Sequence, residues 1–121
     1  MIGLLEGEGE DVRLVGGYSP SSGHHHFPLA PVCPYTGADD VERVTLPATG
    51  TLWAWTAVTT APPGYDGPIP YGFGVVELDG IGLRVVGRLT EPDPGALNDG
   101  QPMRLTTESI GDLTVWAFTP R

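Results

Sequence analysis

The stretch GFGVVELDGIGLRVVGRLT (residues 72–90) carries the clearest architectural signal in this sequence. Its Asp79-Gly80 dipeptide lies between two apolar runs and suits a two-residue type I′ turn, so a β-hairpin is predicted. After the turn, residues alternate between two faces of a strand. The predicted inner face consists of Ile81, Leu83, Val85 and Leu89. The predicted outer face consists of Gly82, Arg84, Val86 and Arg88.

Strand-like runs continue on both sides of this hairpin. TGTLWAWTAVTT (49–60) is rich in β-branched and aromatic residues, and a Gly111-Asp112 turn joins the runs at 102–109 and 113–120. The predicted strands are 49–59, 70–78, 81–89, 102–108 and 113–119. Five amphipathic strands, with a longer connection after the third, predict an all-β protein with a five-stranded OB-fold barrel at residues 48–121. A β-sandwich is the alternative, although its seven strands are hard to find here.

The first of these strands contains two tryptophans of the same parity. Trp53 and Trp55 are predicted to share one face, whereas the barrel interior receives Leu52, Ala54, Thr56 and Val58. Two exposed indole rings are costly to leave in water, so either the rest of the chain or a partner is expected to cover them.

Length and charge limit the classes of protein to consider. A chain of 121 residues fits one domain with a modest core of its own. A net charge of −9, with six Arg and no Lys, disfavours nucleic acid and anionic membranes, whose phosphates need basic side chains. The single cysteine cannot form an internal disulfide, and neither a signal peptide nor a spanning helix is predicted. A cytoplasmic location is expected.

Residues 1–47 differ from the barrel region in being irregular. A short helix is predicted near Ile2, Leu4 and Leu5, and a short strand at 12–15. The segment SPSSGHHHFPLAPVCPYTG (19–37) contains two stretches that look like zinc knuckles. An acidic turn follows at 38–42, where Asp39, Asp40 and Glu42 are predicted to be solvated.

The order of these motifs resembles the acyl-CoA-associated zinc-ribbon/OB-fold family, domain of unknown function thirty-five, over nearly the whole chain. Members typically have a short helix, a CxxCG knuckle, an FP dipeptide, a CPxCG knuckle and an OB barrel. The N-terminal matches are Ser19-Pro-Ser-Ser22-Gly23, Phe27-Pro28 and Cys33-Pro34-Tyr-Thr36-Gly37. The barrel matches are Gly50–Thr56, Pro63-Gly64-Tyr65, Pro70-Tyr71, Val75–Leu78 and Phe118-Thr-Pro120.

The resemblance places the four zinc ligands at positions 19, 22, 33 and 36, which here are Ser, Ser, Cys and Thr. Structural zinc sites use thiolates and imidazoles, and a Ser or Thr hydroxyl does not ionise at neutral pH. His24 and His26 could share a face and join Cys33, but that set is one ligand short. We therefore expect a degenerate ribbon without zinc, whose polar turns keep their shape through hydrogen bonds to the backbone.

The resemblance implies a non-catalytic accessory subunit of a thiolase-superfamily enzyme acting on acyl-CoA. The expected partner is a thiolase-like or lipid-transfer-protein-like aldolase that performs retro-aldol cleavage in steroid side-chain degradation, as a hetero-oligomer. The chain itself would hold no cofactor, and a coenzyme A thioester would be the substrate of the complex. Alternatives are a subunit of an acyl-CoA hydratase or acyltransferase, a free-standing OB-fold binding protein, or a small enzyme using Cys33 or a histidine.

Candidate interface residues follow from this expectation. Aromatic side chains are common interface anchors, and six are candidates here: Phe27, Tyr35, Trp53, Trp55, Tyr65 and Tyr71. Arg84 and Arg88 share a strand face and could meet the phosphates of coenzyme A, although a salt bridge is the favoured role. Since no zinc is expected to stabilise the N-terminal segment, the segment is expected to become ordered only when a partner subunit binds it.

Overall fold

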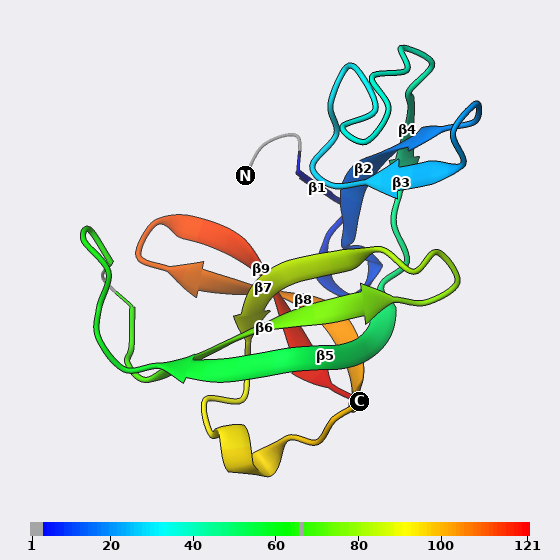
Figure 1. The fold of residues 1–121 in the computed structure, drawn as a ribbon. Coiled ribbons are helices and arrows are strands. Elements are labelled where there is room, and N and C mark those ends of the chain that lie inside the picture. Colours follow the sequence, from blue (N-terminus) through cyan, green and yellow to red (C-terminus); the bar gives the residue numbers. More distant parts are fainter. Residues whose placement is uncertain (1–3, 66) are drawn as a thin grey trace.

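The computed structural model describes residues 4–65 and 67–121, and two β modules make up this part of the chain (Figure 1). The larger module is a closed barrel in the order β5-β6-β7-β9-β8, with β8 pairing back onto β5. Its strands are β5 Thr49–Val58, β6 Tyr71–Leu78, β7 Arg84–Leu89, β8 Pro102–Ile110 and β9 Leu113–Pro120. All pairs are antiparallel except β7 with β9. The predicted all-β OB-fold is confirmed.

The connections of the barrel largely follow the sequence. The longer connection predicted after the third strand contains the 3-10 turn η2 Pro94–Ala96, and β8 and β9 meet at the predicted turn, Gly111-Asp112. The β6–β7 hairpin is present, and its inner face buries Val85 and Leu89 as predicted. Its loop is longer than two residues, because Gly82 also takes a positive φ of 66° and strand β7 begins only at Arg84.

The predicted face assignment in β5 holds for Leu52 and Trp53 but is wrong beyond Trp53. A bulge at Trp53 shifts the register, so that Leu52 pairs with Val76 but Ala54 pairs with Val75 and Trp55 with Gly74. The extra residue changes which side chains of β5 face the core. Trp53 is 53% exposed, while Trp55 packs against the core. The Trp55 indole N–H donates to the carbonyl of Pro94, 3.0 Å away, so the η2 loop covers this ring.

The smaller module is a four-stranded antiparallel sheet built on β2 Arg13–Ser19. β2 pairs with β1 Leu5–Glu6, β3 His24–His26 and β4 Glu42–Thr45. The predicted N-terminal helix is wrong where the structure describes it, because Leu5 lies in β1 and a 3-10 turn, η1 Gly9–Asp11, follows; Ile2 lies outside the described residues. Across residues 4–65 and 67–121, no helix is long and apolar enough to cross a membrane.

The two modules share one hydrophobic cluster. Val12, Leu14 and Leu46, all from the first 47 residues, are buried with the barrel residues Leu52 and Val76. Within the N-terminal segment, the N–H of Leu46 donates to the carbonyl of Leu14 at 2.9 Å, which holds these two buried leucines together. The N-terminal segment therefore supplies part of the core on which the barrel closes.

Trp116 seals the barrel where β7 and β9 diverge. The parallel ladder contains only two registered pairs, Arg88 with Ala117 and Leu89 with Phe118. One position earlier along β9, the Trp116 indole N–H donates to the carbonyl of Val86 at 2.9 Å. Gly87 makes room for this ring, because a Cβ there would lie 2.8 Å from the indole nitrogen.

Candidate functional site

The two predicted knuckles have the tight backbone turns of a zinc ribbon, but they lack three of its four zinc-ligating side chains. We call the smaller module, with strands β1 to β4, the ribbon. The N–H of Gly23 donates to the carbonyl of Ser19, and the N–H of Gly37 to that of Cys33, both at 2.8 Å. Both glycines have positive φ, which closes each turn tightly. The Ser22 hydroxyl and the Cys33 thiol face each other from the two turns, 3.6 Å apart.

The donor set around the knuckles does not fit zinc. Three of its four members are hydroxyls, and the part of the chain that the structure describes contains no group of three His, Cys, Asp or Glu able to hold a metal. His24 packs on Tyr35 and His25 on Tyr18, with ring centroids 5.1 and 4.6 Å apart. His26 is buried, and its Nε2 accepts from the N–H of Ala30 at 3.3 Å.

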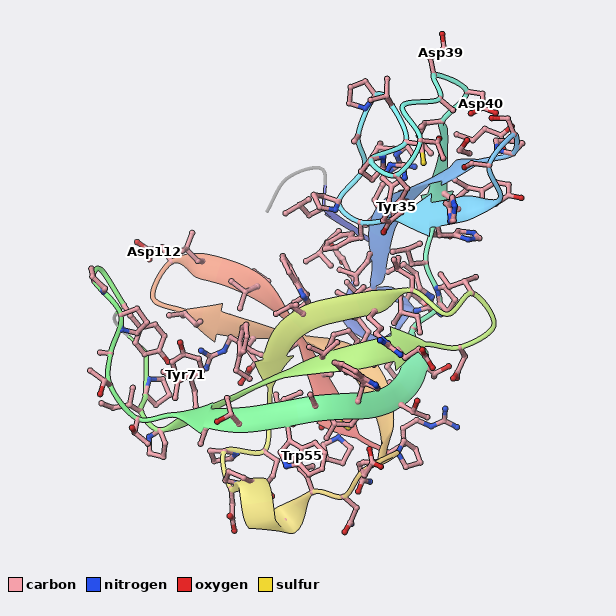
Figure 2. The ribbon with its side chains drawn as sticks, viewed as in Figure 1. Tyr35, Asp39, Asp40, Trp55, Tyr71 and Asp112 are labelled. Carbon is pink, nitrogen blue, oxygen red and sulfur yellow. The ribbon has the colours of Figure 1, made fainter. Side chains whose placement is uncertain are left out.

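A carboxylate links the first knuckle to the chain beyond the second. The Ser19 hydroxyl donates to Asp40 Oδ1 at 2.6 Å, and the backbone N–H of Ser21 donates to Oδ2 at 2.8 Å. Ser19 is fully buried, and the hydrogen bonds from Ser19 and Ser21 lower the pKa of Asp40. Asp40 stays partly exposed, as predicted for this acidic turn, but it also accepts hydrogen bonds that the sequence did not predict (Figure 2).

Cys33 is held in the second knuckle by its neighbours. Its side chain is buried, and its backbone N–H donates to the carbonyl of Ala38 at 2.8 Å. A hydrogen bond from Thr36 leads the contributions that outweigh burial and lower the pKa of the Cys33 thiol to about 7. The same hydroxyls that replace zinc ligands thus stabilise the thiolate in a place that solvent hardly reaches.

We expect the purified, tag-free chain to contain no stoichiometric zinc, because hydroxyls stand at three of the four knuckle positions. Elemental analysis of the wild-type chain and of Cys33→Ala, grown in zinc-supplemented medium, measures this directly. About one zinc per chain in the wild type, lost in the variant, would contradict the expectation.

Asp40 predicts an acid-dependent loss of stability. Its pKa in the folded chain lies below the ordinary 3.8, so the carboxylate stabilises the fold above that value and stops doing so as the pH falls through the lowered value. Urea unfolding midpoints between about pH 3 and pH 6 should fall less steeply for Asp40→Asn than for the wild type. The neighbouring Asp39→Asn is the matched control, and an identical pH slope for Asp40→Asn and wild type would rule out the link.

The six candidate interface aromatics do not form one patch. Figure 2 shows Tyr35 at the N-terminal module, Trp55 at the opposite end of the barrel near η2, and Tyr71 at the base of the β5–β6 loop. Phe27 packs edge-on against Trp116 inside the chain, with ring centroids 5.3 Å apart. Tyr35 is 60% exposed, whereas Tyr65 and Tyr71 stack on each other at 5.0 Å.

The two outer arginines are engaged within the chain. Arg84 lies 4.2 Å above the Trp53 ring and pairs with Glu77 at 3.4 Å. Arg88 donates to Glu108 at 3.1 Å and to the Tyr65 hydroxyl at 3.2 Å, and it lies 4.5 Å from the centre of the Tyr71 ring. Although burial opposes it, these hydrogen bonds raise the pKa of Arg88. Arg88 thus fixes Tyr65 to the barrel wall.

Comparison with known proteins agrees with this architecture. Residues 43–108 match the family model described as "ChsH2, C-terminal OB-fold domain". A "DUF35 domain-containing scaffold protein" of Pyrococcus furiosus is 32% identical over 104 residues, 86% of this chain and 75% of that protein. The chain belongs to the DUF35 family. The resemblance inferred from the knuckle and barrel motifs is confirmed.

A solved DUF35 structure matches in three dimensions. The chain superposes on a chain of the "Ltp2-ChsH2(DUF35) aldolase" with a TM-score of 0.72 and 28% identity, covering 89% of this chain and 84% of the other. Because the match covers 89% of this chain, it includes residues of both modules.

Sequence reasoning missed three residues that organise these surfaces. Asp40 looked like any acidic turn residue, because its partner Ser19 lies 21 positions away. Phe73 and Val86 were not candidates, yet both are exposed on the outer barrel face, at 38% and 47%. Their parity in the two strands was a usable signal, since each alternates with buried neighbours.

Proposed function

We propose that this DUF35 chain is a non-catalytic accessory subunit of a thiolase-superfamily enzyme that acts on an acyl-CoA. The most specific form of the proposal is a retro-aldolase that cleaves a β-hydroxyacyl-CoA in steroid side-chain degradation. The observation that carries it is the superposition, over 89% of the chain, on the DUF35 chain of a solved aldolase. The relative described as a scaffold protein supports a role in organising other subunits.

The features of the surface fit an organising role. The barrel interior is filled by buried apolar side chains, Leu52, Val76, Leu89, Met103 and Phe118 among them. Large apolar side chains are nevertheless exposed at two places, the ribbon loop and the outer barrel face. A surface of that kind is typical of a protein that binds other proteins.

Co-expression with the thiolase-like aldolase encoded nearest in the same genome tests the proposal. We expect a complex that co-purifies and elutes as one species, and cleavage of a steroid β-hydroxyacyl-CoA by the complex but not by this chain alone. Cleavage by the isolated chain would contradict the non-catalytic role. Hydration of an enoyl-CoA by the complex would favour the hydratase alternative, and tight binding of single-stranded DNA at low salt the free-standing OB-fold protein.

Replacing both outer arginines separates two roles in such a complex. Arg84→Ala/Arg88→Ala is expected to weaken the affinity between the subunits more than it raises the KM for acyl-CoA. Both guanidinium groups already pair with carboxylates, which leaves them poorly suited to bind the phosphates of coenzyme A. Titration calorimetry and steady-state kinetics on the same preparations give the two values. A raised KM with unchanged subunit affinity would instead indicate coenzyme binding.

A further inference from the structure

The outer barrel face holds an apolar groove that neither the ribbon nor the core uses. It has a volume of about 400 Å³ and lies where β7 and β9 diverge. We call it the Phe73 groove; it is lined by Phe73, Val86, Gly87, Arg88, Val115 and Trp116. Phe73 also lines a second hollow of about 280 Å³ with Trp55 and Val75, so apolar surface extends across β5, β6 and β7.

The polar side chains of the Phe73 groove are already satisfied. The Trp116 indole N–H donates to the carbonyl of Val86, and Arg88 is bonded to Glu108 and Tyr65. Covering the groove therefore leaves none of these groups without a partner, which removes the main cost of burying a polar surface. Such a groove gains most from an occupant that brings apolar side chains.

Charge also selects the occupant. The outer face carries two arginines, and each is paired with a glutamate: Arg84 with Glu77 and Arg88 with Glu108. The face is thus neutral although the whole chain carries −9. A phosphate needs a free cation, and the Arg88 side chain is only 12% exposed, so a phosphate-bearing ligand gains little here. A neutral apolar face complements a neutral apolar protein surface.

The groove is also built on a stiff support. Arg88 ties Tyr65 to β7, and the Tyr65 ring stacks on Tyr71. Phe27 of the ribbon packs edge-on against Trp116, and so holds the groove wall from the other side. A surface that is ordered before binding loses less conformational entropy in the complex.

We infer that the Phe73 groove is the main docking site for the partner subunit, and that the partner fills it with uncharged apolar side chains. This inference rests on the proposed function, because it takes the thiolase-like aldolase as the occupant. It assigns the central contacts to Phe73 and Val86 rather than to the exposed ribbon residues Leu29 and Tyr35.

The test uses the full chain and the co-expressed aldolase. Val86→Asp places a charge in the groove, and Phe73→Ala removes its largest exposed wall; each is expected to weaken the complex at least about tenfold. Tyr35→Ala and Leu29→Ala are matched exposed controls on the ribbon, expected to stay within about threefold. Circular dichroism and thermal melting of each variant confirm that the fold is retained.

Each outcome has a distinct meaning. Loss of affinity in both groove variants, with the ribbon controls unchanged, supports the inference. A complex that tolerates the groove variants but not the ribbon variants overturns the inference and leaves the proposed function standing. Self-association that Val86→Asp abolishes, without any effect on the aldolase, assigns the groove to a second copy of this chain and also overturns it. If the wild-type chain binds no aldolase, the proposed function is wrong, and the inference that rests on it is wrong as well.

Discussion

Leu14→Ala is expected to lower the free energy of unfolding by about 3 kcal/mol, although the residue lies outside the barrel. Leu14 is fully buried in the cluster that also contains Leu52 and Val76 of the barrel. Truncating it leaves a cavity between the two modules as well as removing apolar contact. Urea denaturation measures the change, and Leu29→Ala, at a leucine that is 38% exposed, should cost less than about 1 kcal/mol.

The same experiment asks whether the modules unfold together. All three tryptophans lie in the barrel, so their fluorescence reports that module, whereas the amide NMR signals of β2 and β3 report the ribbon. A shared core predicts one cooperative transition seen by both probes, in the wild type and in Leu14→Ala. A ribbon that melts at lower urea than the barrel, with Leu14→Ala leaving the barrel unaffected, would show two independent units.

Trp116→Ala is expected to cost about 3 kcal/mol, at the lower end for an aromatic truncation because the ring is only partly buried. The variant removes the indole N–H that satisfies the carbonyl of Val86, and it removes the ring on which Phe27 packs. The barrel seam between β7 and β9 then loses its cover.

Trp53→Ala is the matched control, since it removes the same side chain from a position that is 53% exposed. The variant loses the contact with Arg84 but little burial, so the free energy of unfolding should change by less than about 1 kcal/mol. Urea unfolding of both variants, followed by circular dichroism, gives the comparison. Equal costs at the two positions would mean that Trp116 does not seal the barrel.

The barrel was predictable because its signals are local. Alternation of apolar residues, the Asp79-Gly80 turn and the Gly111-Asp112 turn each involve residues close in sequence, and all five strands lie near their predicted positions. The bulge at Trp53 was not predictable in this way, since it depends on how β5 registers against β6. One extra residue was enough to move Trp55 from the predicted exposed face to a partly buried position against the core.

The candidate sites were predictable only in part, because some of their contacts join residues that are far apart in the sequence. Motif spacing located the two knuckle turns, but the bond from Ser19 to Asp40 joins residues that only the folded chain brings together. The ribbon also looked poor in apolar residues, yet Val12, Leu14 and Leu46 reach the barrel core. The shared core therefore supplies part of the ordering that was expected to come from a partner.

The carboxylate of Asp40 has a consequence for where and when this chain can work. A ribbon closed by a metal competes for that metal with every other zinc protein in the cell, and chelators or thiol oxidation can open it. Here the first knuckle is tied to the chain beyond the second through Ser19, Ser21 and Asp40, none of which a chelator or a mild oxidant can alter. We therefore expect the folding of this chain to be independent of zinc, so that zinc starvation would not limit its supply.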